Sequence, residues 1–147
     1  MIRNATKDDI ESINKLGSII SHNFLNTYDI SSYIDESNYI LLVSENEEFE
    51  GFLLISVNYD SYELEMIIVD EKYRNNGVGS NLICTFVKNY AKIGNAIFLE
   101  VSVNNNTAIE FYKKHGFIPV NIRKNYYDHK TDAYVMKKVI NWKMFIF

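Results

Sequence analysis

The chain has 147 residues, with 15 basic against 19 acidic side chains, and its formal net charge is therefore −4. A chain of this length builds one core that hides roughly 68–70% of the unfolded surface, so a cofactor site and a substrate site must share a single domain. The acidic balance and the lack of a basic tract argue against a nucleic-acid partner and favour a cationic one, because phosphate recognition needs clustered Lys and Arg.

The first part of the chain predicts a strand, two helices and a hairpin. Thr6 and Asp9 are helix-start residues, and apolar side chains then recur at helical spacing from Ile10 to Ile20. The segment after this helix is less regular and is expected to hold a second short helix. In chain order the predicted elements are a strand at 1–5, a helix at 6–20, a short helix within 22–39, and paired strands at 39–44 and 49–59.

The second part alternates strands with helices. Thr107 and Glu110 have capping-box spacing at the start of one short helix, and Gly116 is placed to end it. The order of elements predicts a mixed α/β sheet with helices on both faces, in one domain that covers residues 1–140. The predicted elements are strands at 62–69 and 96–103, helices at 82–90 and 107–115, and a closing hairpin of strands at 118–126 and 132–140.

The loop at residues 74–79, with the sequence RNNGVG, gives the first indication of chemistry. It joins an apolar strand to a helix, and a helix N-terminus preceded by glycines is a ready anion site, because backbone N–H groups converge there and glycine permits close approach. The spacing fits neither GxGxxG nor GxxxxGK[ST]. A plain glycine turn would explain the two glycines alone, so the interpretation depends on the surrounding segments.

Together with the preceding strand, this loop resembles the coenzyme A loop [RQ]-x-x-G-x-[GA] of the GNAT acyltransferases, and the resemblance covers nearly the whole chain. It implies the GNAT fold, a mixed and mostly antiparallel sheet whose fourth and fifth strands splay apart, with acetyl-CoA as cosubstrate. The pantetheine arm would bond to the backbone of Ile67, Ile68 and Val69 in the gap. The loop residues implied to bind the pyrophosphate are Arg74, Asn75, Asn76, Gly77, Val78, Gly79 and Ser80.

A second segment, LEVSVNNNTAIEFYKKHGF at residues 99–117, resembles the stretch LEVRxSNxxAixxYxxxGF of the RimI-type amino-terminal acetyltransferases. The resemblance implies that Glu100 is the general base, Tyr112 the general acid and Asn105 a coenzyme A contact. Elementary chemistry agrees, because acetyl transfer from a thioester needs a neutral amine, an acceptor for its proton and a donor for the departing thiolate. Taken alone, Tyr112 would fit a core aromatic residue equally well.

Two further carboxylates stand on the strand before the loop. Glu63 precedes Arg74 by eleven residues, where the histone-acetylating GNAT enzymes carry their catalytic glutamate, and Glu65 follows it two positions later on the same strand face. Glu63 is therefore a second candidate for the catalytic base, and Glu65 a candidate substrate-binding residue that attracts a cationic N-terminus. A solvated strand end would explain both side chains as well.

The C-terminal hairpin and the free-energy cost of deprotonating the amine both favour an α-amine as acceptor. Residues 123–127, RKNYY, and the later DAYVM resemble the RxNYY…DAxxM ending of protein N-terminal acetyltransferases, which implies that Tyr126 and Tyr127 contact the substrate peptide. An α-amine with a pKa of about 7.8 costs roughly 1 kcal/mol to deprotonate at pH 7, whereas lysine at about 10.4 costs over 4. In a chain with 11 tyrosines, a tyrosine-rich edge hairpin is the plainer alternative.

These features predict an acetyl-CoA dependent N-acetyltransferase acting on the α-amine of a protein N-terminus. The resemblance implies a ribosomal protein as acceptor, with direct attack by the amine, Glu100 as base and Tyr112 as acid. One alternative is acetylation of a polyamine or another small amine, which Glu63 and Glu65 would suit. Another is a noncatalytic acyl-CoA sensor. Monomer and homodimer are both compatible with the sequence.

The remaining features concern compartment, metals and the chain end. Cys84 excludes an intrachain disulfide and is expected as a buried small side chain. No charged leader with an apolar core begins the sequence and no apolar run spans a bilayer, so we expect a cytoplasmic protein without membrane contact. The three histidines lack metal-ligand spacing, and no metal is expected. The apolar extension at residues 141–147 would pack on the domain, support a dimer contact or fray.

Overall fold

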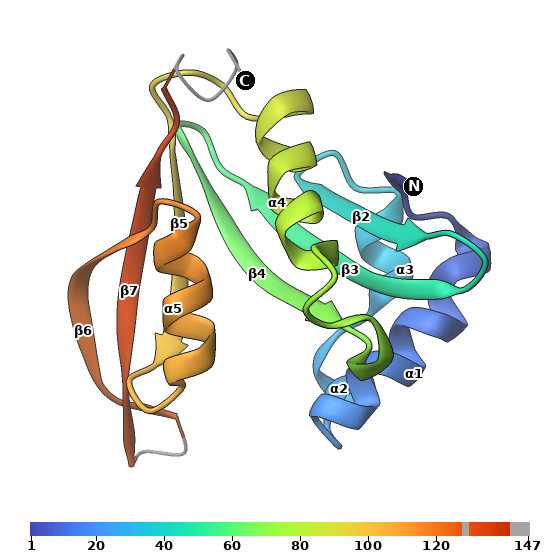
Figure 1. Ribbon diagram of the computed structural model, residues 1–147, viewed down its shortest axis with the longest axis horizontal. Coiled ribbons are helices and arrows are strands. Elements are labelled where there is room, and N and C mark those ends of the chain that lie inside the picture. The colour runs from blue at the N-terminus through green and yellow to red at the C-terminus, as the bar shows by residue number, and fades with distance from the viewer. Residues whose placement is uncertain (128–129, 142–147) are drawn as a thin grey trace.

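A single mixed sheet runs through the molecule (Figure 1). The computed structural model describes residues 1–127 and 130–141. The strand order is β1-β2-β3-β4-β5-β7-β6, and among these described strands only β4 and β5 pair in parallel, which confirms the predicted mixed, mostly antiparallel sheet. The strands are β1 (Ile2–Asn4), β2 (Tyr39–Glu45), β3 (Phe49–Val57), β4 (Ser61–Val69), β5 (Ala96–Ser102), β6 (Ile118–Tyr127) and β7 (Thr131–Val139), and the helices are α1 (Ile10–Ile20), α2 (Phe24–Thr27), α3 (Ile30–Ile34), α4 (Val78–Asn89) and α5 (Asn106–Lys114).

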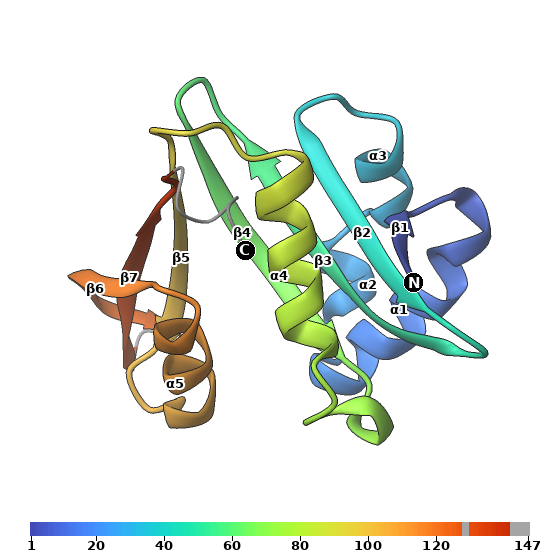
Figure 2. The same ribbon diagram turned by 45° about the horizontal axis from the view of Figure 1, so that its top comes forward.

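Helices cover both faces of the sheet, as the sequence predicts (Figures 1 and 2). Because successive side chains of a strand point to opposite faces, β3 supplies both cores. Leu53 packs in the core under α4, which also holds Leu82 and Phe86 of that helix. Phe52 packs in the other core with Ile13 of α1. The two faces are therefore separate apolar layers.

Three local predictions differ from the structure. The segment within 22–39 contains two short helices, α2 and α3, where one was expected. Helix α5 begins one residue earlier than predicted, and its cap is Asn105, whose Oδ1 accepts a hydrogen bond from the Ala108 amide at 3.2 Å, so the capping box at Thr107 is wrong. Cys84 is exposed, because helical periodicity leaves it between the buried positions of α4 and off their face.

The sheet opens between β4 and β5. These strands pair only over three positions, the last of which joins Glu63 to Phe98, and they then diverge (Figure 1). A β-bulge follows at once on β4, because Leu64 and Met66 pair with consecutive residues of β3 and leave Glu65 without a partner on that strand. A bulge bends a strand and increases its twist, so this extra residue explains locally why β4 turns away from β5.

The bulge also exchanges the faces of β4. Leu64 and Ile67 both pack with the core under α4, although they are three positions apart, whereas Met66 and Ile68 pack with the core on the α1 face. Beyond Glu63, the edge of β4 that points away from β3 pairs with no described strand. Free backbone groups therefore line one side of the opening.

Arg3 fastens the start of the chain to the rest of the fold. Its guanidinium forms two hydrogen bonds with the buried carboxylate of Asp9, at 2.7 and 2.9 Å, and one with Glu45 at 2.8 Å. These contacts lower the pKa of Asp9 and tie β1 and the end of β2 to the turn that starts α1. Arg3 is thus structural.

No helix in the described part of the chain is long and apolar enough to cross a membrane. The described residues likewise contain no cluster of His, Cys, Asp and Glu arranged to hold a metal ion. The predicted C-terminal extension lies outside the described residues from Trp142 onward, as does His129.

Candidate active site

A cavity of about 560 Å³ lies between the end of β4, the loop after it, and the helices α4 and α5. It brings together every residue predicted to bind the cofactor except Asn76, and Tyr112 of α5 lines it as well. Segments far apart in the sequence therefore meet at one site. The predicted cofactor residues that line the cavity are Ile67, Ile68, Val69, Arg74, Asn75, Gly77, Val78, Gly79, Ser80 and Asn105.

The loop takes its shape from two residues in the left-handed region. Asn75 has φ of 63° and Gly77 has φ of 81°, so the chain turns twice before α4 begins at Val78. Glycine adopts this conformation without strain, and asparagine tolerates it better than most residues. Arg74 fastens the loop to the strand, because its Nε donates a hydrogen bond to the Val69 carbonyl at 3.1 Å.

Gly79 meets a different requirement, which is close approach. A Cβ atom at this position would lie 3.1 Å from Cζ of Phe111 and 3.7 Å from Cγ2 of Val69. A side chain here would therefore crowd Phe111 of α5, make ordinary contact with Val69 of β4 and narrow the cavity. Phe111 is the wall that the sequence did not assign to the site, although its position beside Tyr112 on a short helix was the available clue.

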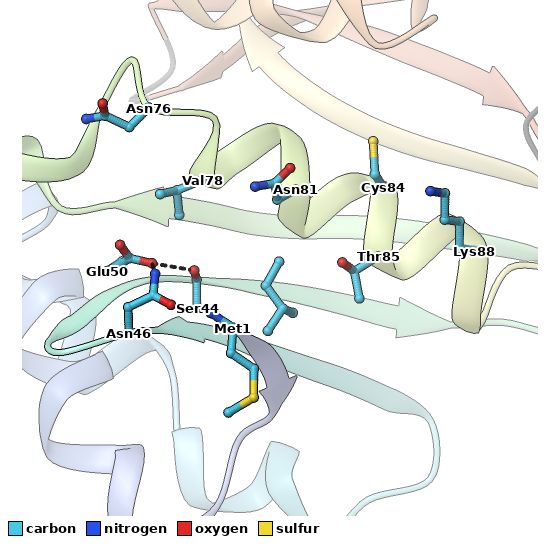
Figure 3. Close-up of a pocket in the computed structure, with 11 residues that line it drawn as sticks. Met1, Ser44, Asn46, Glu50, Asn76, Val78, Asn81, Cys84, Thr85 and Lys88 are labelled. Atoms are coloured by element: carbon cyan, nitrogen blue, oxygen red, sulfur yellow. Dashed lines mark hydrogen bonds between the residues drawn. The ribbon is translucent and has the colours of Figure 1, made fainter. Parts of the chain in front are cut away.

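Asn76 lies apart from the other loop residues. Its side-chain Nδ2 donates a hydrogen bond to the Arg74 carbonyl at 3.0 Å. The residue lines a second hollow of about 450 Å³ between α4 and the start of the sheet (Figure 3). That hollow contains the buried carboxylate of Glu50, which accepts hydrogen bonds from Ser44 and Asn46. A cofactor contact through the Asn76 backbone remains a prediction.

Tyr112 of α5 lines the cavity and packs against the core under α4. Burial raises the pKa of its phenol to about 12, with a smaller contribution from Tyr127 on β6. The ring contacts Phe111 and Phe117 edge-on, with centroids 5.5 and 5.7 Å away. The hydroxyl therefore keeps its proton at neutral pH and is available as a donor, so the core role and the chemical role predicted for this residue are compatible.

Glu100 lies on the face of β5 opposite the core under α4, because Leu99 and Val101 on either side of it belong to that core. Its Oε1 accepts a hydrogen bond from Nη1 of Arg123 at 2.6 Å. Its Oε2 is buried and has no hydrogen-bond partner among the described residues. An unpaired buried carboxylate oxygen is costly, so this atom marks a place for a water molecule or a substrate donor.

Glu63, Glu65 and Glu100 form one carboxylate cluster. Burial raises the pKa of Glu63, and the negative charges of Glu65 and Glu100 raise it further, whereas Arg123 opposes them. Glu65 is exposed, and its Oε1 accepts a hydrogen bond from the Ser56 hydroxyl at 2.9 Å. The structure therefore gathers all three glutamates on one side of the opening, with a single guanidinium among them.

The closing hairpin carries Tyr126 and Tyr127 to this cluster by an irregularity in β6. Arg123 pairs with Ala133 and Tyr127 with Thr131, so two extra residues of β6 bulge outward. Asn125 takes φ of 52° in this bulge, and its amide donates a hydrogen bond to Asp132 Oδ1 at 2.9 Å.

The two tyrosines form the outer wall of the cluster. The Arg123 guanidinium carbon lies 4.4 Å from the Tyr126 ring centroid, and the nearby Glu100 carboxylate raises the pKa of Tyr126 to about 12. Burial, Glu100 and Tyr28 after α2 raise the pKa of Tyr127. The sequence named Arg123 within the motif without giving it a role, and it gave Tyr28 none.

Comparison with known proteins agrees with this geometry. Residues 9–117 match the family described as the acetyltransferase (GNAT) family. The chain belongs to this family.

Individual GNAT relatives cover nearly the whole chain. The N-alpha-acetyltransferase of Sulfurisphaera tokodaii is 29% identical and aligns with 92% of this chain and 90% of its own length. The putative ribosomal protein bS18-alanine N-acetyltransferase of Bacillus subtilis is 29% identical over 95% of each chain. The crystal structure of the ribosomal-protein-S18-alanine N-acetyltransferase from Escherichia coli has a TM-score of 0.80 at 26% identity and covers 96% of this chain and 94% of that one.

GNAT acetyltransferases use acetyl-CoA, and the residues present fit that molecule. The loop and the first turn of α4 offer backbone N–H groups to a diphosphate, and the free edge of β4 offers hydrogen-bonding groups to the amides of a pantetheine arm. The space over Gly79, which a Cβ would fill, leaves room beside Phe111.

Proposed function

We propose that this GNAT enzyme transfers the acetyl group of acetyl-CoA to the α-amine of a protein N-terminus, with a ribosomal protein as the first acceptor to test. The observation that carries the proposal is the position of Tyr112, which lines the cofactor cavity and is near enough to Tyr127 of β6 for that residue to contribute to its raised pKa. The names of the relatives from Sulfurisphaera and Bacillus support an α-amine as acceptor.

On the cofactor side, the chain's own groups bind and orient the thioester. The loop from Arg74 to Ser80 would hold the diphosphate, and the backbone of Ile67, Ile68 and Val69 would hold the pantetheine arm. Asn105 would contact the same molecule from the start of α5. Bound acetyl-CoA supplies an activated acetyl group. Tyr112, which stays protonated at neutral pH, would give its proton to the departing sulfur.

On the acceptor side, the carboxylate cluster would attract the N-terminal ammonium and remove its proton. Glu100 is the proposed base, acting through a water molecule at its unpaired Oε2. Glu65 would help to draw in the ammonium, and Tyr126 and Tyr127 would close over the first residues of the peptide. Glu63 competes with Glu100 for the role of base, since its raised pKa gives it the greater proton affinity expected of a useful base.

The test is acetyl transfer to a panel of acceptors. The purified protein is incubated with acetyl-CoA and short peptides that begin with the N-terminal residues of ribosomal proteins, alongside the same peptides with blocked α-amines and an internal lysine. We expect mass spectrometry to find one acetyl group on the free α-amine. Acetylation of lysine side chains alone would contradict the proposal.

A small polyamine is the second candidate acceptor, because three carboxylates face the opening with a single guanidinium among them. Spermidine and other small amines therefore belong in the same panel. Faster turnover of these amines than of every peptide would favour this candidate over the N-terminal one. Tight coenzyme binding without transfer to any amine would instead indicate a sensor.

A further inference from the structure

Ser80 and His115 join the two helices that wall the cofactor cavity. Ser80 lies in the first turn of α4 and lines the cavity, while His115 caps the C-terminus of α5 and does not line it. The Ser80 Oγ and the His115 Nε2 are 2.8 Å apart, across 35 residues of sequence. His115 therefore reaches the cavity through the serine hydroxyl.

Two further contacts hold His115, one at its backbone and one at its ring. Lys138 of β7 donates a hydrogen bond from its ammonium to the His115 carbonyl, and the Phe111 ring centroid lies 4.8 Å from the imidazole centroid. Burial lowers the pKa of His115, and the positive charges of Lys138 and Lys114 lower it further. At neutral pH the ring is therefore uncharged, with one nitrogen as donor and the other as acceptor.

The neutral ring leaves two arrangements for the pair. If Nε2 accepts, the only proton of the serine hydroxyl is spent on the imidazole. If Nε2 carries the hydrogen and donates it to Oγ, the hydroxyl proton is free for another acceptor. A diphosphate offers acceptors and no donors, so its arrival favours the second arrangement.

We propose that His115 is a positioning residue, which turns the Ser80 hydroxyl proton toward the diphosphate of bound coenzyme A. The inference rests on the proposed use of acetyl-CoA. Neither the loop motif nor the catalytic residues account for a histidine at this place. It adds a side-chain contact to a phosphate site that is otherwise made of backbone N–H groups.

Equilibrium binding of 3′-dephospho-coenzyme A tests the proposal by calorimetry. This probe keeps the diphosphate and lacks the 3′-phosphate, whose own ionisation near pH 6 would confuse a pH series. At pH 7.5, we expect Ser80→Ala and His115→Leu each to raise the Kd about three- to tenfold, the worth of one hydrogen bond. The double variant should bind no more weakly than either single one. His115→Gln, which offers an amide N–H in place of Nε2, should bind within about twofold of the wild type.

A pH series tests whether the imidazole lies close enough to the bound diphosphate to act on it. As the pH falls from 7.5 to 5.5, the wild type should bind more tightly, because protonated His115 adds a positive charge near the diphosphate and the bound anion raises the imidazole pKa. The gain is about tenfold at most for each unit of that rise. His115→Gln should lack this gain, while Lys114, Lys138 and the nearby Cys84 remain in both proteins.

A wild type that does not bind the probe overturns the proposed cofactor site together with this inference. A wild type that binds, with His115→Leu binding equally well, overturns this inference alone. It also fails if His115→Gln binds as weakly as His115→Leu, or if its affinity follows pH as the wild type does. Circular dichroism checks that each variant is folded.

Discussion

The two faces of the sheet at the β4–β5 opening differ in the chemical groups that shape them. On the α4 and α5 face, the cavity is shaped by backbone: the left-handed Gly77, the close approach at Gly79 and the free edge of β4. On the opposite face, the site is shaped by charged and aromatic side chains, which include Glu100 and Arg123. The first face suits a ligand with fixed phosphate and amide groups, and the second suits a variable cationic one.

If the proposed function holds, this difference lets one domain bind two kinds of ligand. Backbone groups cannot change with substitution, so the cofactor face is set by where the chain turns. Side chains can change singly, so the acceptor face is open to specialisation without loss of the fold. Tyr112 lines the cavity on the α4 face, and Tyr127 of β6 is close enough to contribute to its raised pKa.

Tyr112→Phe is expected to have the largest effect, since it removes the hydroxyl proposed to protonate the departing sulfur. If the phenol donates its proton to the sulfur, kcat should fall by roughly two to four orders of magnitude. The ring and its packing remain, so the Kd for coenzyme A should stay unchanged. Steady-state kinetics and calorimetry measure the two quantities, and an unaltered kcat would remove Tyr112 from the mechanism.

Glu100→Gln and Glu63→Gln sharpen the acceptor face. We expect Glu100→Gln to lower kcat by roughly 100-fold or more, as loss of a general base does, and Glu63→Gln to have a smaller effect. A base must be ionised, so kcat falls as the pH drops through its pKa in the complex. If Glu63 is the base, this acid limb lies above the usual carboxylate range, because the pKa of Glu63 is raised, and Glu63→Gln abolishes it. That result would transfer the role from Glu100.

Glycine substitutions probe the cofactor face. Gly79→Ala should weaken coenzyme A binding, because its Cβ would narrow the cavity, and should lower the free energy of unfolding by about 1–3 kcal/mol, because that Cβ would lie 3.1 Å from Phe111. Gly77→Ala and Gly94→Ala form a matched pair, since both glycines have positive φ, 81° and 94°, and no atom closer than 4.0 Å to a new Cβ. Each should lose about 1–2 kcal/mol of stability in denaturant unfolding. Coenzyme binding should weaken for Gly77→Ala alone, and equal weakening in Gly94→Ala would argue against a loop-specific role.

Arg123→Lys should have the smallest effect. The positive charge remains beside Glu100, but the planar fork and its stacking on Tyr126 are lost. We expect kcat/KM for the peptide acceptor to fall by a factor of about two to five, in keeping with a partly exposed ion pair. The Kd for coenzyme A should not change. A weaker coenzyme complex in this variant would show that the two faces are not independent.

The sequence named most residues on both faces, but it did not predict the contacts that join the side chains on the face of Glu100. The loop at residues 74–79 is a continuous segment, and its glycine spacing predicts where the chain turns. The ion pair of Glu100 with Arg123 depends on strand order, because β7 lies between β5 and β6 in the sheet. No pattern along the chain says that these two strands flank a third.

The smaller differences between the predicted and the observed structure also have causes at single residues. Asn105 and Thr107 are both good capping residues, and tertiary context chose the earlier one. The apolar character of α4 predicts a buried Cys84, but the side chain falls off the buried face of the helix. The bulge at Glu65 was invisible, because an alternating strand with one extra residue has no distinct composition.

The brief pairing of β4 with β5 has a mechanical consequence. Three register positions join the β1–β4 half of the sheet to the β5–β7 half, so much of the seam between them is left open. A pantetheine arm bound along β4 would bridge the opening between the two halves. Because this site exists only in the folded protein, binding would stabilise the native state. At a coenzyme concentration one hundred times its Kd, that linkage is worth about 2.7 kcal/mol of unfolding free energy. The bound pantetheine arm would then slow amide hydrogen exchange along the open edge of β4. Cofactor binding would thus stabilise the junction between the two halves of the sheet.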